Sequence, residues 1–283
     1  MNSKRQKALS LVELAEQTLA IQDQGAYQAP SGRRVEIAGQ QAKAVDRTRL
    51  YTPEDLIQLD GQAMATRAQT TQITVTEEKT QAAVRRLVQD EGIEDPVVLN
   101  FASARHVGGG FLKGARAQEE DLVRCSGLFR CLETQQSTYY AINRAESSLL
   151  YSDHMIYSPG VPWFRDEALT LLETPFLASV ITAPAPNAGP HLQRHPGDQE
   201  AVRQTLRRRA RYILRVAEAQ RHSVLVLGAW GAGVFKNNPV DVAATFGELL
   251  EGPFAGHFRH VVFAVVDATK EQPRLLAFRA RFQ

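Results

Sequence analysis

The sequence predicts a three-layer α/β domain, with helices on both faces of a largely parallel or mixed sheet. Two observations indicate this fold class. From Thr71 onward, short apolar runs alternate with amphipathic stretches, and no segment repeats. Two of the apolar runs lead directly into glycine-rich loops. Strands that alternate with helices usually pair in parallel, and ligands bind where loops leave the carboxyl ends of such strands.

Composition limits the functions that such a domain can have. The chain has 283 residues, of which 43% are hydrophobic, enough for one large domain or two small ones. Lysine and arginine number 33, and aspartate and glutamate number 31. This balance argues against a protein that binds nucleic acid through basic tails, although it is compatible with local basic patches.

The cysteines and the N-terminus indicate the compartment. Cys125 and Cys131 are six residues apart on one expected helix, so they lie on different turns and are not expected to form a disulfide. Glu13 and Glu16 interrupt the N-terminal apolar stretch, which lacks the core of a secretory signal. No run reaches the ~20 apolar residues that span a bilayer. We therefore expect a cytoplasmic protein.

Residues 1–72 are predicted to form a mainly helical extension packed on a core that spans residues 73–283. Apolar residues at helical spacing predict a helix over 3–22. Residues 29–32 predict a turn, residues 35–37 a short strand, and Thr52-Pro53-Glu54-Asp55 the start of a helix.

The core is expected to alternate strands and helices. A strand carrying Ile73 and Val75 precedes a helix that Thr76 can cap and that runs to Gly92. A buried strand over 96–99 and a helix from near Glu119 to near Glu133 follow. The later elements are strands over 155–157, 176–183, 223–227 and 260–266, a long helix over 198–220 and a helix opened by Pro239. Residues 158–160 (Ser-Pro-Gly) are expected to stop the first of these later strands.

The stretch from Asn100 to Glu120 carries the clearest functional pattern, NFASARHVGGGFLKGARAQEE. Its three consecutive glycines let the backbone approach a ligand and adopt φ values that other residues avoid. Glu119 and Glu120 then open the next helix, at the edge of this ligand site. The alternative interpretation is an ordinary acidic first helical turn that complements the helix dipole, preceded by a mobile glycine turn.

A second glycine loop, GAWGAGVF over residues 228–235, follows a predicted strand directly. Its small residues can present successive backbone N–H groups to an anion, so two such loops at two strand ends predict a diphosphate ligand. A Rossmann fingerprint fits poorly, because the spacing is not G-x-G-x-x-G and the next helix begins only at Pro239. Plain core packing is the alternative role of Trp230 and Phe235.

The sequence predicts neither a metal site nor a cofactor. His191 and His195 are four residues apart, but they lie in a Pro/Gly-rich loop without a third ligand, and H-E-x-x-H is absent. A G-x-S-x-G elbow is also absent, and the cysteines lack an obvious base, so nucleophilic hydrolase chemistry has no support.

The spacing of Gly108-Gly109-Gly110, seven residues and Gln118-Glu119-Glu120 resembles the signature of the poly(ADP-ribose) glycohydrolases. With residues 100–102 (Asn-Phe-Ala) before it and 231–235 after it, the chain is similar to the bacterial-type branch of that family, over roughly residues 75 to 270. The first signature is highly specific, whereas non-hydrolytic macrodomains share the second loop. The resemblance implies a macrodomain-like three-layer α/β/α core with a mixed central sheet.

The resemblance also implies an activity, the hydrolysis of the ribose–ribose O-glycosidic bond of poly(ADP-ribose) to release ADP-ribose. It implies that Glu120 protonates the departing ribose oxygen and that Glu119 holds ribose hydroxyls. Gln118 would orient the loop, the two glycine loops would cover the diphosphate from two sides, and Phe235 would buttress the terminal ribose. The candidate substrate-binding residues are Asn100, Ser103, Gly108, Gly109, Gly110, Gln118, Gly231, Ala232, Gly233, Val234 and Phe235. Thr269, near the end of the last core strand, is a further candidate on the adenosine side.

The adjacency of the two glutamates restricts the mechanism independently of the family. Glycosidases commonly set two carboxylates on opposite faces of the sugar. Side chains of adjacent residues at a helix start diverge by about 100°, so Glu119 and Glu120 cannot easily do so. We therefore hypothesise that Glu120 acts twice, first donating a proton to the leaving group and then accepting one from the attacking water.

Two other functions stay open, binding of ADP-ribose without cleavage and removal of single ADP-ribose groups from protein side chains. The expected partners are poly(ADP-ribose) and ADP-ribosylated proteins as substrates and ADP-ribose as product, with no membrane and a monomeric protein. The resemblance places the protein in the DNA damage response. The arginines of the 198–220 helix, at positions 203, 207, 208, 209 and 211, are expected on its solvated side, with contact to polymer phosphate as the alternative.

Overall fold

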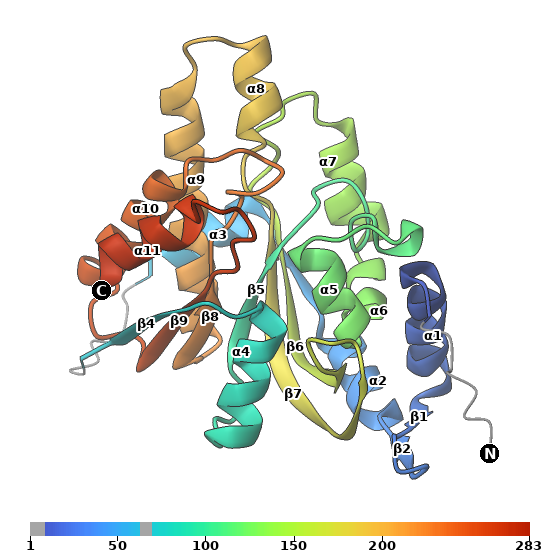
Figure 1. The fold of residues 1–283 in the computed structure, drawn as a ribbon. Coiled ribbons are helices and arrows are strands. Elements are labelled where there is room, and N and C mark those ends of the chain that lie inside the picture. The colour runs from blue at the N-terminus through green and yellow to red at the C-terminus, as the bar shows by residue number, and fades with distance from the viewer. Residues whose placement is uncertain (1–8, 63–69) are drawn as a thin grey trace.

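A seven-stranded sheet forms the middle of three layers (Figure 1). The computed structural model describes residues 9–62 and 70–283. The strand order is β3-β6-β7-β5-β8-β9-β4. β6 is antiparallel to both of its neighbours, and the five strands from β7 to β4 are parallel to one another. The predicted three-layer α/β class with a mixed central sheet is confirmed.

The elements have the following bounds in the described residues. The strands are β1 (Ala26–Gln28), β2 (Arg34–Glu36), β3 (Arg49–Tyr51), β4 (Gln72–Thr76), β5 (Val97–Phe101), β6 (Met155–Arg165), β7 (Leu171–Ala183), β8 (Val224–Leu227) and β9 (His260–Ala264). The α-helices are α1 (Leu11–Gln24), α2 (Ala38–Arg47), α3 (Pro53–Asp60), α4 (Thr80–Arg85), α5 (Gln118–Cys125), α6 (Leu128–Glu133), α7 (Ala141–Ala145), α8 (Ala188–Arg194), α9 (Gln199–Ala219), α10 (Pro239–Glu251) and α11 (Pro273–Phe282). Short π-helical turns η1 (Arg86–Asp90) and η3 (Gln136–Tyr140) and a 3-10 turn η2 (Phe111–Lys113) complete the set.

Alternating side chains of the inner parallel strands are buried in two separate cores. In β5, Val97 and Leu99 belong to the core formed with α9, α10 and α11, whereas Val98 belongs to the core formed with α4, α5 and α6. Figure 1 shows these two groups of helices on opposite faces of the sheet. Because both faces are covered, such strands are apolar throughout rather than alternating.

The N-terminal segment has the predicted elements and also joins the sheet. Helix α1 starts at Leu11, where Ser10 and Glu13 form a capping box; residues 3–8 of the predicted helix lie outside the described residues. β1 and β2 pair as a hairpin around the predicted turn, and Thr52 caps α3. β3 pairs with β6, so the segment before residue 73 supplies an edge strand of the central sheet. The division of the chain at residue 72 stays a prediction.

The prediction of one continuous helix from Glu119 to Glu133 was wrong, because the helix is interrupted near its middle. α5 ends at Cys125 and α6 begins at Leu128. Between them Ser126 is extended and bridges to Trp163, and the Gly127 N–H donates to the Pro162 carbonyl at 2.8 Å. These backbone contacts with β6 replace the helical hydrogen bonds that would otherwise continue α5 into α6. Both cysteines are free and buried, on separate helices.

Two predicted boundaries also differ. Thr76 does not cap a helix, because it pairs with Ala264 as the last residue of β4, and α4 begins later, at Thr80, and passes into η1 before Gly92. The Ser-Pro-Gly segment does not stop β6, which continues to Arg165. Gly160, at φ 55°, forms a bulge there and donates its N–H to Ser179 Oγ at 3.0 Å.

Arg209 contradicts the prediction that the arginines of α9 all lie on its solvated side. It is fully buried, and its Nε donates to Asp153 Oδ1 at 2.7 Å. Its two terminal nitrogens donate to the carbonyls of Leu150, Tyr151 and Pro184 at 2.6 to 3.0 Å. The segment before β6 folds over α9, and only an arginine can satisfy so many of its carbonyls at once. Arg203 and Arg207 remain exposed.

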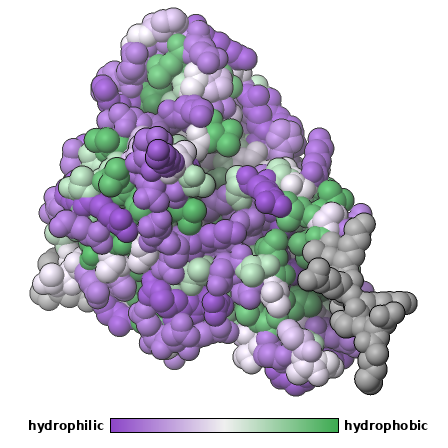
Figure 2. All heavy atoms as spheres, in the orientation of Figure 1, coloured by the Kyte–Doolittle hydropathy of each residue, from purple (hydrophilic) through white to green (hydrophobic). Residues whose placement is uncertain are grey.

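No helix in the described ranges 9–62 and 70–283 is both long and apolar enough to cross a membrane. The face of the molecule in Figure 2 is mostly hydrophilic, with hydrophobic residues in small groups.

Two matched substitutions on α9 test the buried arginine. We expect Arg209→Met to lower the free energy of unfolding by about 3 to 5 kcal/mol, because it leaves Asp153 and several carbonyls without their buried partner. Arg207→Met, at an exposed position paired with Glu248, is expected to change it by less than about 0.5 kcal/mol. Urea denaturation of both variants measures the difference, and equal effects would contradict the structural assignment.

Candidate active site

A cavity of about 620 Å³ opens at the carboxyl edge of the sheet. Its wall is built from segments that follow strand ends, namely Phe101–Ser103 after β5, Ala229–Phe235 after β8 and Ala264–Val266 at the end of β9. The start of α5, including Glu119 and Glu120, closes it from the side. The site therefore lies where the α/β sheet order predicts a ligand.

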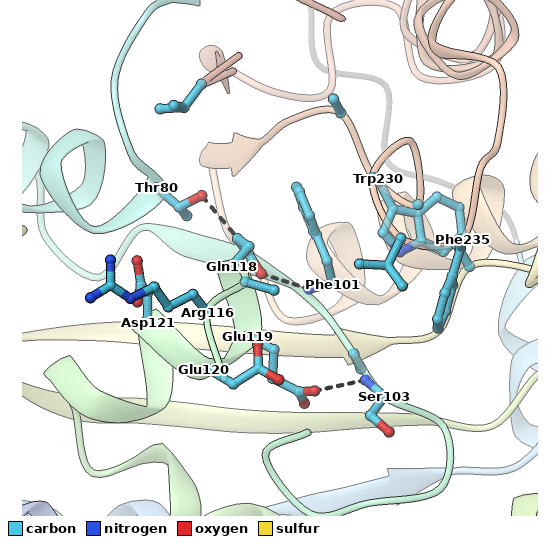
Figure 3. A pocket seen from close by; sticks show the side chains of 18 of the residues that line it. Thr80, Phe101, Ser103, Arg116, Gln118, Glu119, Glu120, Asp121, Trp230 and Phe235 are labelled. Carbon is cyan, nitrogen blue, oxygen red and sulfur yellow. Dashed lines mark hydrogen bonds between the residues drawn. The ribbon is translucent and has the colours of Figure 1, made fainter. Parts of the chain in front are cut away.

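Gln118 fixes the start of α5 onto the end of β5. Its Oε1 accepts a hydrogen bond from the Phe101 N–H at 2.9 Å, and its Nε2 donates to the Leu99 carbonyl at 2.8 Å and to Thr80 Oγ1 at 3.3 Å (Figure 3). The amide thus pairs with β5 as another strand would. This contact supports the orienting role expected for Gln118.

Glu119 is held by both of its oxygens. Oε2 accepts the Ser103 N–H at 2.7 Å, and Oε1 accepts Asn100 Nδ2 at 3.1 Å. Asn100 itself is fully buried, also donates to Thr182 Oγ1, and does not line the cavity. The structure therefore places Asn100 behind Glu119, as a residue that positions the carboxyl, and places Ser103 in the cavity wall.

Burial determines the protonation state of Glu119, which is only 3% exposed. Loss of solvent raises the pKa of Glu119 to about 8, the hydrogen bonds from Ser103 and Asn100 oppose this rise, and the neighbouring charge of Glu120 adds to it. The positive end of α5 also favours the charged form, but the cost of burial is larger.

Glu120 differs from Glu119 in having a free oxygen. Its Oε1 accepts the Gly110 N–H at 2.7 Å. Its Oε2 is buried and has no hydrogen-bond partner in the described part of the chain. Burying a carboxylate oxygen without a hydrogen-bond partner costs free energy, so this oxygen is a candidate for contact with a ligand.

The glycine triplet holds the carboxyls and does not line the cavity. Gly108 and Gly109 have φ values of 61° and 63°, in the left-handed region. A Cβ on Gly109 would clash with Glu120 Oε1 and would lie 2.8 Å from Glu119 Oε2. Both carboxyls therefore lie against the same glycine, on one side of the cavity.

The second glycine loop faces the cavity with free N–H groups. Gly231, Gly233, Val234 and Phe235 line it, while Ala232 does not. Within the described residues, the backbone N–H groups of the four lining residues donate no hydrogen bond. Free donors close together on one glycine loop are suited to binding an anion, as in backbone nests.

Several other residues have a different place from the expected one. Trp230 is fully buried, donates its Nε1 to the Ala183 carbonyl at 3.1 Å and forms the back of the cavity wall, so it combines both predicted roles. Thr269 does not line the cavity. Its hydroxyl donates to Asp267 Oδ1 at 2.7 Å, and Asp267 in turn pairs with Arg274, which does line it.

Sequence reasoning missed part of the wall. The missed lining residues include Thr80, Phe101, Arg105, His106, Arg116 and Tyr151. Phe101, Arg105 and His106 lie in the stretch already selected, so their position after a strand end was a usable signal. Tyr151 had none, because it precedes the antiparallel strand β6 and is placed by contacts that are distant in the sequence, including those with Arg209 and Phe235.

The described residues contain no group of three or more histidine, cysteine, aspartate or glutamate side chains that could hold a metal ion.

Known proteins match both the sequence and the fold. The family model of the microbial-type PARG catalytic domain matches residues 15–166, PARG being poly(ADP-ribose) glycohydrolase. The crystal structure of poly(ADP-ribose) glycohydrolase from Thermomonospora curvata is 50% identical, with a TM-score of 0.89, over 96% of this chain and 99% of that chain. A structure of the same enzyme bound to the inhibitor ADP-HPD is 49% identical, with a TM-score of 0.87 and the same coverage. Poly(ADP-ribose) glycohydrolase from Deinococcus radiodurans in complex with ADP-ribose is 50% identical, with a TM-score of 0.82, over 88% of this chain and 99% of that chain. No curated protein matches the chain.

The family match covers more than half of the 283 residues and includes the glycine triplet and both glutamates. The structural matches extend beyond it through the second glycine loop. The macrodomain-like fold implied by the sequence is confirmed by these matches. The chain belongs to the microbial-type poly(ADP-ribose) glycohydrolase family, a family of glycosidases.

Proposed function

We propose that this protein hydrolyses the ribose–ribose O-glycosidic bond of poly(ADP-ribose) and releases ADP-ribose, with Glu120 as the general acid and base. One observation carries the assignment. In the buried carboxyl pair, Glu120 Oε2 is the oxygen without a partner, and Glu120 lines the cavity. A proton at this atom can be given to a substrate oxygen without breaking an existing hydrogen bond.

The reaction then needs two proton transfers at one atom. Protonated Glu120 donates to the 2′-oxygen of the departing ribose, the glycosidic C–O bond breaks, and the bonding electrons stay on that oxygen. An oxocarbenium-like ribose remains. Water adds to its anomeric carbon and returns a proton to Glu120. The Gly110 N–H on Oε1 holds the carboxyl in place through both steps.

Glu119 has the complementary role of gripping ribose hydroxyls. Both of its oxygens already accept hydrogen bonds, so its orientation is fixed before substrate binds. Each carboxyl oxygen has a second lone pair, which remains available to a substrate hydroxyl. Because both glutamates lie beside Gly109, they act on one side of the sugar, and a second carboxylate on the opposite face is not required.

The free N–H groups of Gly231, Gly233, Val234 and Phe235 are proposed to bind the diphosphate. Relatives with this fold bind ADP-ribose and the inhibitor ADP-HPD, which supports the same ligand here. Gly108 to Gly110 would contribute by placing the carboxyls rather than by covering the phosphates. Ala232 and Thr269 would act only through their neighbours.

The alternatives are less well supported. A module that only binds ADP-ribose gains nothing from two buried carboxyls near an anionic ligand, since they weaken binding by repulsion. Removal of single ADP-ribose groups from proteins would use the same acid, and comparing polymer with mono-ADP-ribosylated protein as substrates distinguishes the two activities.

We further propose that polymer-bearing ADP-ribosylated proteins are the physiological substrates, in the DNA damage response, and that the protein acts as a cytoplasmic monomer. Two free, buried cysteines support a reducing compartment. Size-exclusion chromatography with light scattering tests the oligomeric state.

The central test is Glu120→Gln, which keeps the shape of the side chain and removes its acidity. We expect the release of ADP-ribose from polymer to fall by about 10² to 10⁴-fold, with ADP-ribose binding measured by calorimetry largely retained. Glu94→Gln, at an exposed residue without a hydrogen bond in the described chain, is the matched control. Wild-type turnover in Glu120→Gln would rule the mechanism out.

A second test separates positioning from backbone strain. Gly109→Ala places a methyl group among both carboxyls at a positive φ, whereas Gly92→Ala, at φ 67°, meets nothing within 4 Å. Both should lose about 1 to 2 kcal/mol of stability through φ strain. We expect only Gly109→Ala to lose a further ~100-fold in kcat, because displaced catalytic groups lose about that much. Similar kcat values in the two variants would count against the role of Gly109.

The raised pKa of Glu119 predicts a pH-dependent stability. Between its ordinary value of 4.5 and about 8, the folded state keeps a proton that the unfolded state has lost, so folding becomes less favourable as pH rises through this window. Glu119→Gln cannot titrate. The difference in free energy of unfolding between wild type and Glu119→Gln, measured by urea denaturation at pH 5 and pH 8, should therefore shift in favour of the variant. A pH-independent difference would refute the assignment of this proton.

A further inference from the structure

We propose that Arg105 and Arg144 form a phosphate subsite for the nucleotide unit on the leaving-group side of the scissile bond. The inference rests on the proposed function, because the subsite is defined relative to the bond that Glu120 cleaves. It would make the enzyme recognise two successive units of the polymer rather than the released ADP-ribose alone.

Arg105 lies in the loop that connects the two carboxyl contacts. This loop begins at Ser103, whose N–H donates to Glu119, and ends at Gly110, whose N–H donates to Glu120. Arg105 lines the cavity within it. Figure 3 shows Ser103 beside the carboxyls, with Arg116 on their opposite side. Arg105 thus follows the carboxyl contact of Ser103 by two residues, and its Cζ lies 5.5 Å from the ring centroid of Tyr151, which also lines the cavity.

Arg144 is joined to Arg105 through the backbone. Arg144 Nη1 donates to the Arg105 carbonyl at 3.1 Å, and its Nη2 donates to the Gln136 carbonyl at 3.2 Å. Arg105 in turn donates from Nε to the Asn143 carbonyl at 3.2 Å and from Nη2 to the Glu146 carbonyl at 2.9 Å. The two guanidinium groups are therefore held by reciprocal contacts between the first loop and α7.

In the part of the chain that the structure describes, no carboxylate balances their positive charge, and Arg105 contacts the face of the Tyr151 ring as a cation–π pair. In the described ranges, neither guanidinium has a carboxylate within 4 Å. Each has used two of its five N–H donors on neutral carbonyls, so three remain. The Glu146 carboxylate on the same segment accepts the Ser148 N–H. Two ordered cations with spare donors and no counterion are suited to phosphate.

The arginines of α9 offer the contrast. Sequence reasoning left contact with polymer phosphate open for them, but Arg203, Arg207 and Arg208 pair with Asp241, Glu248 and Asp153. Arg274, in the cavity wall, pairs with Asp267. Binding phosphate at any of these would compete with an existing ion pair. Arg105 and Arg144 have no such competitor.

The chemistry of the substrate supplies the ligand. The leaving group of each cleavage is the ribose of an adenosine whose other end carries a diphosphate, so two phosphates follow the scissile bond by a few bonds. Their charge is absent from a substrate in which terminal ADP-ribose is attached to a small neutral aryl group. Comparing the two substrates isolates the subsite from the cavity that holds ADP-ribose.

Arg144→Gln is the test variant, because Arg144 does not line the cavity. We expect the ratio of KM for polymer to KM for the aryl ADP-ribose glycoside to rise on the order of tenfold, as for the loss of one charge-assisted contact. Arg144→Lys keeps the charge and should give a smaller rise. Arg207→Gln, at an exposed arginine neutralised by Glu248, is the control and should leave the ratio unchanged.

A second measurement does not depend on a variant. For the wild type, log KM should rise more steeply with log salt concentration for polymer than for the aryl glycoside, and Arg144→Gln should reduce the slope for polymer by about 0.7. Equal slopes would overturn the subsite.

The outcomes separate this inference from the proposed function. If the wild type does not cleave polymer, the proposed function fails. If the wild type cleaves polymer and Arg144→Gln has an unchanged ratio, or loses activity equally on both substrates, the subsite is refuted. If Arg116→Gln changes the ratio instead, the polymer leaves on the other side of the carboxyls, which also overturns the proposal.

Discussion

The site depends on the contact by which the first turn of α5 docks onto the end of β5. At this point the sheet offers unpaired backbone groups at Leu99 and Phe101, and Gln118 satisfies both with one side-chain amide. The helix is thereby fixed in register with the strand. Glu119 and Glu120 follow on the same turn, so their direction is set by the sheet rather than by a flexible loop. Rigid elements of this kind keep catalytic groups within the narrow tolerance that the chemistry needs.

The docking of α5 also buries two carboxyls, and the glycine triplet allows backbone donors to reach them. Two carboxyls at the start of a buried helix need hydrogen-bond donors, and Asn100 supplies one from its side chain, to Glu119. The loop from Ser103 to Gly110 supplies further donors as backbone N–H groups, one to each carboxyl. A backbone can come this close only where no Cβ intervenes, which is the condition at Gly109. The glycine triplet is therefore explained by the position of the two carboxyls. Backbone N–H groups without a hydrogen bond are found in the second loop instead.

Most of the fold could be predicted because it rests on local patterns. The apolar runs of β5, β8 and β9, the start of α3 and the length of α9 all follow from neighbouring residues. The errors lie where a distant partner decides. Ser126 leaves its helix to bridge to Trp163, and Gly160 is retained in β6 as a bulge. Arg209 is buried because the segment before β6 folds over it. These partners are distant in the sequence, so a local sequence pattern does not reveal them.

The residues of the site likewise divide into those that a local pattern predicts and those that a distant partner places. Gln118, Glu119 and Glu120 were predicted to lie at the site from their specific spacing to the glycine triplet, and most of the second loop from its position directly after a strand. The place of Asn100 was not, since a residue at a strand end can point into the cavity or behind it, and the outcome depends on Thr182 in the neighbouring strand.

The placement of charge explains why this site suits catalysis better than tight binding. A protein selected only to hold a diphosphate would surround it with donors and cations, yet this cavity, whose lining includes Arg105, Arg116 and Arg274, also places two carboxyls at one end. Burial keeps the pKa of Glu119 at about 8, so the pair carries less than its full negative charge near neutral pH. Repulsion of the incoming anion is thereby reduced. The same retained proton makes the folded state less stable as pH rises, so the burial that reduces this repulsion lowers stability at high pH.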